Sequence, residues 1–372
     1  MRVLIHCPAI GTESGSGIRA RLIVEGLRSC GDDVCILSRE VPSDLAGTGA
    51  SIRLLAEGDG VEEAICRAGG SFRPDIVYGI TEASADAVSD ASKRIGVPVA
   101  FDLHGLGFVE VLELGAGYGP RYGRAKNSLR WLSRIRKADA VTVANPCLLP
   151  VLKWLNPRAE PVIGMTDVSR FRPEGDAVRP GSGKETIRVL YAGNYFRWQG
   201  VDLLLDAIRM LPGEGDGSGF EFTLIGSVGK RGEQLEKWKS WFPAGRVRFL
   251  DSVGYAQIAD HYRGADVTVL PRPFLLSTYL AFPQKLVDSM ASGRVVVATD
   301  IAPHRWALAS PEAGILCPAT AKGIAAGILR TKDPKLRERL SESARREAVD
   351  RYCHLKQSRR IHAIFSGVLS GS

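Results

Sequence analysis

The segment from Phe282 to Asp300, FPQKLVDSMASGRVVVATD, constrains the fold most strongly, because it predicts a short helix followed by a fully buried strand. Pro283 suits the first turn of a helix, and Leu286 and Met290 supply an apolar face. Gly293 ends that helix, and the all-apolar run VVVA that follows is typical of a central strand in a parallel sheet. The segment therefore indicates an α/β protein.

Lys285 stands in the first turn of this helix, where the partial positive charge of the helix N-terminus opposes a lysine. An anion held jointly by backbone N–H groups and the ammonium would remove that conflict. Asp288 lies one turn further along the same face, where it could accept hydrogen bonds from a pair of sugar hydroxyls. A phosphate and a diol together indicate a nucleotide site. The competing interpretation is an ion pair between Lys285 and Asp288 in solvent.

Composition limits the classes of protein that fit. A chain of 372 residues with 45% hydrophobic and 24% charged residues is globular, and its length predicts two domains. It has no apolar run of the roughly 20 residues needed to cross a bilayer, and Met1-Arg2 leads directly into a short strand, so we expect a cytoplasmic protein. The net charge of +8 favours an anionic partner: nucleic acid, phospholipid headgroups or a phosphorylated substrate.

The seven cysteines form no Cys-x2-Cys pair and lie scattered on apolar segments, which indicates reduced core thiols. Neither a zinc site nor cysteine catalysis is expected.

Short apolar strands alternate with amphipathic helices along the chain, which predicts two tandem Rossmann-like, doubly wound domains. Ligands in such sheets bind at the carboxyl ends of the strands, and here also in the cleft between the domains. We expect a first domain over 1–170, a linker over 171–186, a second domain over 187–350 and a C-terminal helix over 351–372 that packs back on the first domain. The polar stretch Pro173–Lys184 carries the linker prediction.

Several segments, in this order, resemble the GT-B glycosyltransferases of the family-four group of retaining enzymes. The matching segments are Val189–Asn194, Gln199–Leu205, Phe222–Gly226, Ala265–Pro271 and Met290–Asp300, with His104-Gly105 and Asp167–Pro173 in the first half. The resemblance implies a GT-B fold, and a sugar transfer from a nucleoside diphosphate sugar that needs no metal ion or other cofactor.

The chain departs from the family pattern around the donor site. Two glutamates eight positions apart are usual there, and this chain has Leu280 and Asp288. It is similar to the subgroup with Pro-x-Lys before the second acid, supplied by Pro283 and Lys285. Asn194 and Gln199 also replace the usual Arg and Lys of the phosphate loop, with Arg197 between them.

The resemblance implies roles for particular residues. Lys285 and Arg197 would neutralise the leaving diphosphate, Asp288 would bind the ribose, and the backbone of Ala281–Phe282 would face the donor. The remaining residues expected at the donor site are Gly15, Gly17, Gly193, Asn194, Gly226 and Leu286.

His104 is expected across the cleft, near the donor sugar or the acceptor hydroxyl; alternatively it is a hydrogen-bonded histidine at a strand end. Gly11, Gly15 and Gly17 form a flexible first loop that could close over donor and acceptor or be a surface turn, and Arg19 is an optional second anion contact.

Two other classes of function remain open. Gly15-Ser-Gly17-Ile-Arg-Ala20 matches the dinucleotide fingerprint of NAD(P)-dependent oxidoreductases, with Glu40 for the ribose. That fingerprint requires its first glycine directly after the strand, and here Pro8–Ser14 intervene. A non-catalytic sugar-nucleotide-binding protein is the second alternative, because the first glutamate is missing. The net positive charge is the only feature that favours a nucleic acid as partner. Because the sequence shows no basic face with stacking aromatic residues, we do not expect the protein to bind nucleic acid.

A basic helix over residues 121–137 raises the question of membrane contact. Leu129, Leu132 and Ile135 share a broad face of this helix, and Trp131 falls away from it. Such a helix could rest on an anionic membrane surface or simply be a solvated face. The partners expected are therefore a nucleotide-sugar donor, an acceptor that is a glycan, a lipid-linked molecule or a small metabolite, and peripheral contact with an anionic membrane.

Overall fold

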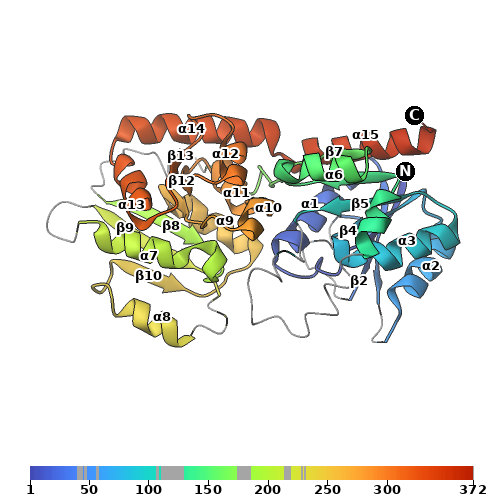
Figure 1. Cartoon of the computed structure of the whole chain (residues 1–372), viewed down its shortest axis with the longest axis horizontal. Helices are drawn as coiled ribbons and strands as arrows, with labels where there is room; N and C mark the ends of the chain where they lie inside the picture. Colours follow the sequence, from blue (N-terminus) through green and yellow to red (C-terminus); the bar gives the residue numbers. More distant parts are fainter. Residues whose placement is uncertain are drawn as a thin grey trace. The chain divides into compact units, whose positions relative to one another are not determined.

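The computed structural model describes residues 1–39, 45, 48–55, 58–105, 109, 130–173, 186–212, 219–227, 229 and 232–371. The chain forms two compact units (Figure 1). The first comprises Met1–Met165, Leu280–Phe282 and Cys353–Ser372; the second comprises Thr166–Tyr279 and Pro283–Tyr352. Residues 174–185, most of the predicted linker, lie outside the described part.

The first unit is built on a seven-stranded parallel sheet with the order β3-β2-β1-β4-β5-β6-β7. Its strands are β1 (Arg2–His6), β2 (Asp33–Ser38), β3 (Ser51–Leu54), β4 (Ile76–Ile80), β5 (Val99–Leu103), β6 (Ala140–Val143) and β7 (Ala159–Pro161). Strands β1, β2, β4, β5 and β6 are almost entirely buried, as expected where helices cover both faces of a sheet.

Helices cover both faces of this first sheet. They are α1 (Gly15–Ser29), α2 (Val61–Phe72), α3 (Ala85–Ile95), α6 (Leu149–Leu155) and α15 (His354–Ser370), with 3₁₀ turns η2 (Glu82–Ser84) and η3 (Pro146–Leu148). α2, α3 and α6 share one hydrophobic core with the sheet, and α1 and α15 share the other. Ser14 caps α1 by accepting a hydrogen bond from the Gly17 amide at 3.2 Å, a contact that contributes about 1 kcal/mol.

The second unit has a six-stranded parallel sheet with the order β10-β9-β8-β11-β12-β13. Its strands are β8 (Ile187–Ala192), β9 (Phe220–Ile225), β10 (Val247–Leu250), β11 (Val267–Leu270), β12 (Val295–Thr299) and β13 (Ile315–Cys317). The chain runs outward from β8 to β9 and β10, then continues with β11 on the other side of β8. The order of the strands therefore reverses between β8 and β11.

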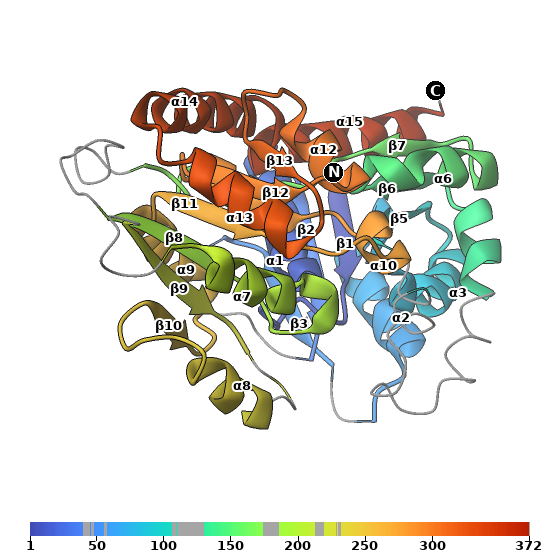
Figure 2. The same ribbon diagram turned by 60° about the vertical axis from the view of Figure 1, so that its left-hand side comes forward.

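Figure 2 shows α7 and α13 on the near side of this second sheet and α9 behind it. The helices of this unit are α7 (Val201–Met210), α8 (Gly232–Lys239), α9 (Tyr255–Gly264), α10 (Leu276–Leu280), α11 (Gln284–Ala291), α12 (Ala302–Leu308), α13 (Ala321–Arg330) and α14 (Pro334–Arg351), with the 3₁₀ turn η5 (Arg197–Gln199). α7 and α13 share a core with alternate residues of β8, β9, β11 and β12. The last residue of α10, Leu280, groups with the first unit.

The two doubly wound parallel sheets confirm the predicted fold class. The helix and strand predicted within Phe282–Asp300 are confirmed as α11 and β12, and Gly293 follows the helix with φ of 63°. In the part of the chain that the structure describes, no helix is long and apolar enough to span a bilayer.

Candidate functional site

The loops that follow β8 and β11 meet where the strand order of the second sheet reverses, which is where open α/β sheets bind ligands. Gly193 and Asn194 follow β8, and Arg272 follows β11. A Cβ at Gly200 would overlap the carbonyl of Pro271, so only glycine allows the two loops to pack together. The strand reversal therefore brings the loop after β8 against the turn after β11.

The amine of Lys285 lies beside the first residue after β8. Its Nζ is 2.7 Å from the position that a Cβ on Gly193 would occupy, so the absence of a side chain there leaves room for the ammonium. Among the described residues, the Lys285 backbone carbonyl accepts a hydrogen bond from the Tyr262 hydroxyl, whereas Nζ has no ion-pair partner and the Asp288 carboxylate acts on it only at longer range. The solvent-exposed ion pair between Lys285 and Asp288 is therefore not present.

Arg272 is the second cation at this position, and only 6% of it is exposed. Its Nε donates to Oε1 of Gln199 at 3.4 Å, and its guanidinium lies 5.5 Å from the centre of the Trp198 ring. Burial and the charge of Arg272 together lower the pKa of the Lys285 amine to about 7. The positive charge of Arg272 disfavours the Lys285 ammonium, and a bound dianion would relieve that repulsion.

Asp288 is buried on the next turn of α11, with 4% exposure. Its Oδ1 accepts a hydrogen bond from Nε2 of Gln284 at 3.0 Å, and the Thr166 hydroxyl is a further partner. Burial raises the pKa of the carboxyl to about 7, against the opposing effect of these hydrogen bonds. Lys285 and Asp288 thus both change charge near neutral pH.

The other expected donor-site residues of the second unit differ in exposure. Arg197, at the start of η5, and Asn194 are exposed, and the Asn194 carbonyl accepts a hydrogen bond from the Tyr191 hydroxyl at 2.8 Å. Gly226 packs so closely that a Cβ would overlap the Gly193 carbonyl. Leu286 is fully buried and its amide donates to the Pro283 carbonyl at 2.9 Å, which makes it a packing residue of α11.

Ala281 and Phe282, half-buried, group with the first unit. There the Phe282 ring occupies the space that a Cβ on Gly164 would need.

In the first unit, His104 belongs to a hydrogen-bonded chain. Its Nδ1 lies 3.1 Å from Oγ of Ser16, and its Nε2 contacts the Asp102 carboxylate. Asp102 is fully buried and accepts two hydrogen bonds from Arg19, at 2.8 and 2.9 Å, and one from Thr142 at 2.5 Å. Burial opposes ionisation, but Arg19 and then His104 hold the pKa of Asp102 well below its usual range.

Gly15 and Gly17, expected in a flexible first loop, belong to the first turn of α1. A Cβ on Gly17 would overlap the carbonyls of Ala9 and Thr12, whereas Gly15 has no atom within 4 Å of that position. The expectation that Arg19 contacts an anion is wrong, because Arg19 is 3% exposed and bonded to Asp102. Asp102 lies 83 positions from Arg19 in the sequence, so the sequence alone does not reveal this partner.

The segment Gly15–Ala20, which matches the dinucleotide fingerprint, does not follow its strand through the tight turn that the fingerprint requires. β1 ends at His6 and α1 begins at Gly15, so Cys7–Ser14 intervene, and Glu40 lies outside the described residues.

The basic helix predicted over residues 121–137 is described only from residue 130. Trp131 is 3% exposed and packs in the core, so the expectation that it falls away from the apolar face is wrong. Arg134 donates to Asp86 at 3.1 Å and to Asp90 at 2.9 Å. In its described part this helix uses its apolar face and one of its cations for packing within the first unit.

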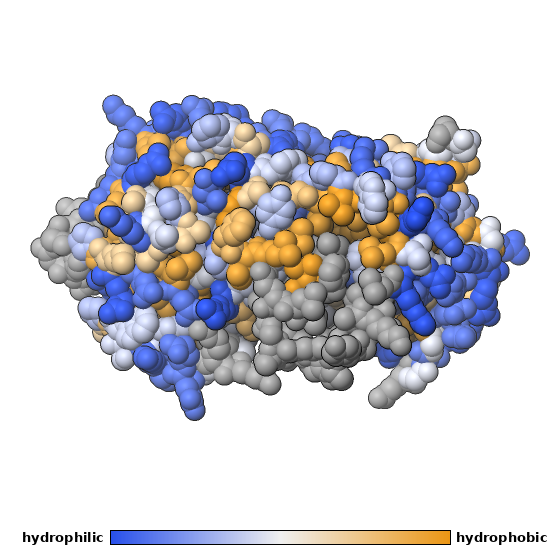
Figure 3. Space-filling model, in the orientation of Figure 1, coloured by the Kyte–Doolittle hydropathy of each residue, from blue (hydrophilic) through white to orange (hydrophobic). Residues whose placement is uncertain are grey.

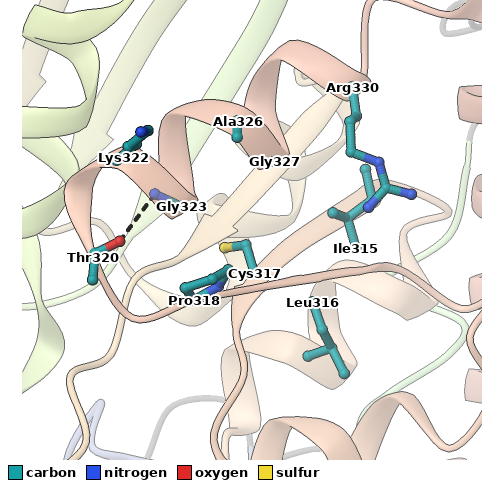
Figure 4. Close-up of a pocket in the computed structure, with 10 residues that line it drawn as sticks. All are labelled: Ile315, Leu316, Cys317, Pro318, Thr320, Lys322, Gly323, Ala326, Gly327 and Arg330. Carbon is teal, nitrogen blue, oxygen red and sulfur yellow. Dashed lines mark hydrogen bonds between the residues drawn. The ribbon is translucent and has the colours of Figure 1, made fainter.

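One pocket of about 370 Å³ lies in the second unit beside β13 and α13 (Figure 4). Lys322 and Arg330 flank an apolar wall that includes Leu316 and Cys317, and the Thr320 hydroxyl accepts from the Gly323 amide at 3.0 Å. None of the residues expected at the donor site lines this pocket. Among the described side chains, no group of three or more His, Cys, Asp and Glu is placed to hold a metal ion.

The amino-acid sequence is similar to those of known glycosyltransferases. The family model described as "Glycosyl transferases group 1" matches residues 186–333. A D-inositol 3-phosphate glycosyltransferase of Thermomonospora curvata is 28% identical over 279 residues, which cover 69% of this chain and 63% of that protein. The protein of the same name from Acidothermus cellulolyticus is 25% identical over 388 residues, which cover 91% and 83%. The chain thus spans less than two thirds of the first relative and most of the second.

Among solved structures, Anabaena HepE in complex with UDP-glucose superposes with a TM-score of 0.78 and 16% identity, over 99% of this chain and 100% of that one. Two parallel Rossmann-like sheets, with a cationic site where the strand order of the second reverses, give this chain the GT-B fold. Residues 186–333 are therefore similar to the group 1 glycosyltransferases, and the two relatives are similar to this chain over most of its length.

Proposed function

We propose that this chain moves a sugar from a nucleoside diphosphate sugar to an acceptor hydroxyl with retention of configuration and without a bound metal ion. The observation that carries the proposal is the ammonium of Lys285, which lies beside Gly193 with Arg272 nearby and without an ion-pair partner among the described residues. The Pro-x-Lys sequence at Pro283–Lys285 supplies this cation at the start of α11.

The reaction breaks the bond between the anomeric carbon and the diphosphate oxygen and forms a bond to the acceptor oxygen, with release of the acceptor proton. Negative charge grows on the departing diphosphate, so cations fixed beforehand lower the barrier. Lys285 and Arg272 are proposed to bind the diphosphate, with Arg197 approaching from the exposed η5 turn. Asp288, held by Gln284, is proposed to bind the ribose hydroxyls.

The domain assignment is part of the proposal. We propose residues 1–170 as the acceptor-binding domain, 171–186 as linker, 187–350 as the donor-binding domain and 351–372 as a helix that belongs with the first. His104, oriented by Asp102 and Ser16, is proposed to act on the acceptor side.

The identity of donor and acceptor is proposed from the relatives. HepE was solved with UDP-glucose, which makes a UDP-sugar the first donor to test. The two curated relatives are named for D-inositol 3-phosphate, which makes an inositol phosphate the first small acceptor to test. Lipid-linked and glycan acceptors form the next set.

The test is thermal unfolding in the presence of UDP, GDP, ADP, TDP, CMP or NAD, with and without a chelator. A ligand at 100 times its dissociation constant stabilises a protein by about 2.7 kcal/mol, which shifts the unfolding midpoint measurably. We expect one nucleoside diphosphate to stabilise the protein, with no effect of the chelator. Lys285→Ala should abolish the shift, and Lys322→Ala, an exposed lysine of α13, should keep it.

Stabilisation by NAD alone would replace this proposal with an oxidoreductase. Stabilisation without turnover of the matching nucleotide sugar would favour the non-catalytic binder, because Leu280 stands where the family carries its first glutamate. Stabilisation that requires a metal ion would contradict the metal-independent mechanism.

A further inference from the structure

Helix α6 is apolar on both its inner and its outer face. Leu152 is 2% exposed and packs in the core of the first unit, whereas Val151 is 59% exposed and Trp154 is 85% exposed. Pro150, before Val151, is also exposed. A helix that is apolar all round is normally buried, and clustered apolar side chains at the surface mark an interaction site.

Cations surround these exposed side chains. Lys153 and Arg158 are exposed, and Nζ of Lys153 lies 3.8 Å from Oε1 of Glu160 on β7. The other oxygen of the same carboxylate lies 3.5 Å from Arg360 of α15. Glu160 is the one acidic residue within 149–161 and 354–370, all of which the structure describes, so positive charge prevails there.

These residues form one surface of the first unit. Figures 1 and 2 both show α6 and β7 beside α15, and Figure 3 shows apolar residues at the surface where Figure 1 places α6. We define the α6 surface as Val151, Lys153, Trp154, Arg158 and Arg360.

We propose that the α6 surface binds the interface of an anionic lipid membrane. Tryptophan prefers the membrane–water interface, where its ring is in the apolar layer and its N–H meets polar groups. Lysine and arginine beside it are attracted to anionic headgroups. Val151 adds an aliphatic contact next to Trp154.

The other occupants fit the α6 surface less well. A single-stranded nucleic acid needs several stacking aromatics along a basic groove, and this surface offers one, Trp154. A second copy of the chain would bring a like-charged surface against Lys153, Arg158 and Arg360, and like charges oppose such an interface. An acidic membrane complements both the charge and the apolar character.

The small number of cations predicts weak, reversible binding that depends on salt. Each charge acts within a Debye length, about 10 Å at 0.1 M salt and about 3 Å at 1 M. The protein should therefore bind acidic vesicles at low ionic strength and leave them at high ionic strength.

The experiment is sedimentation of the full chain with vesicles of phosphatidylcholine alone or mixed with phosphatidylglycerol, at low and high salt. We expect binding to the mixed vesicles only, released by high salt. Trp154→Ala, and separately Lys153→Glu with Arg158→Glu, should each weaken partitioning about tenfold or more.

The matched controls lie in the second unit. Met210→Ala removes an apolar side chain that is 60% exposed, and Lys237→Glu with Lys239→Glu makes the same charge change on α8. Both controls should bind vesicles like the unaltered protein. A circular dichroism spectrum of every variant is recorded to check that the variant is folded.

Three outcomes would overturn the proposal. The first is no pelleting with acidic vesicles at low salt, and the second is binding that survives both the Trp154 and the double charge variants. The third is concentration-dependent self-association, seen by sedimentation velocity without vesicles, that is lost in Trp154→Ala, since the surface would then be a contact between copies. Vesicle binding needs no substrate, so the result is independent of the proposed sugar transfer.

Discussion

At the residue scale, the pKa values of Lys285 and Asp288 determine how the candidate site responds to pH. Burial lowers the pKa of the amine and raises that of the carboxyl, so that both are about 7. As pH rises through this range, Lys285 loses a positive charge and Asp288 gains a negative one. Both changes make the site less favourable for an anion.

We therefore predict that affinity for the nucleoside diphosphate falls as pH rises above about 7. A bound diphosphate favours the protonated amine of Lys285, so binding above this pH takes up a proton. The affinity should fall by up to about tenfold per pH unit, which corresponds to about 1.4 kcal/mol. Calorimetric titration from pH 6 to 9, in buffers of different ionisation enthalpy, measures both effects. An affinity that stays constant up to pH 9 would contradict the assignment of Lys285.

Arg272 contributes to this titration, which gives a second prediction. Removal of its charge in Arg272→Ala should weaken diphosphate binding and also raise the pKa of Lys285. The pH above which affinity falls should then move upward. Arg209→Ala is the matched control, since Arg209 lies over the Trp241 ring at 4.8 Å much as Arg272 lies over Trp198. A control variant with the same shift would show that the effect is not specific.

The buried charge pair of the first unit predicts a large effect on stability. Asp102→Ala leaves the guanidinium of Arg19 buried without its carboxylate, so the free energy of unfolding should fall by about 3–5 kcal/mol. Asp86→Ala removes an exposed partner of Arg134 and should cost about 1 kcal/mol or less. Urea denaturation of the two variants compares them directly, and equal losses would refute the argument.

At the element scale, the first turn of α1 depends on the absence of one Cβ. Gly17→Ala places a methyl group against the carbonyls of Ala9 and Thr12, so the loop before α1 must move, at a cost of about 1–3 kcal/mol. Gly15→Ala, two residues earlier and without atoms within 4 Å of the added group, should be neutral or slightly stabilising. Thermal unfolding distinguishes the pair; two equal midpoints would contradict the steric explanation.

Most elements could be predicted from sequence because buried parallel strands are apolar throughout. The sequence pattern predicts strands over Ala140–Val143, Val247–Leu250 and Val267–Leu270 and a helix over Val201–Met210. The structure has β6, β10, β11 and α7 at these bounds. β3 was not predicted because it is an edge strand with exposed, partly polar residues. α2 and α13 were not predicted because each contains two glycines, which lower helix propensity. The apolar packing of these helices against neighbours outweighs that local penalty.

The candidate site was only partly predictable. The conflict between Lys285 and the helix dipole, and the spacing to Asp288, were visible in the sequence. Arg272 was missed, although an arginine between two prolines directly after a predicted buried strand was a usable indication. The partnership of Arg19 with Asp102, which lie 83 positions apart, could not be predicted, because strand order brings them together.

At the scale of the whole molecule, each unit has its own sheet and core, but the first unit is assembled from distant parts of the chain. α15 supplies Ile361 and Phe365 to its core, both fully buried. The Phe365 ring packs edge-on against Tyr78 with 5.0 Å between ring centres. The C-terminal helix is therefore an integral part of the first unit.

Phe365→Ala should destabilise the first unit by about 3–5 kcal/mol, the usual cost of removing a buried phenylalanine ring. Because the two units need not unfold together, hydrogen exchange of peptides from β1, β4 and α1 is the appropriate measurement. Phe274→Ala removes a ring that is 74% exposed and should leave the exchange unchanged. Uniform loss of protection in both units would contradict a separate core.

The return of α15 also has a consequence for biosynthesis. A ribosome makes residues 1–165 long before it reaches Phe365, so the earliest part of the nascent chain waits, with the α15-binding face of its sheet uncovered, until the second unit has been translated. The first unit therefore cannot complete its core before the second unit has been translated, although domains usually fold in order from the N-terminus during synthesis. Translation speed and chaperone occupancy over the intervening residues should therefore influence the yield of active protein more strongly than they do for a molecule whose units are continuous in sequence.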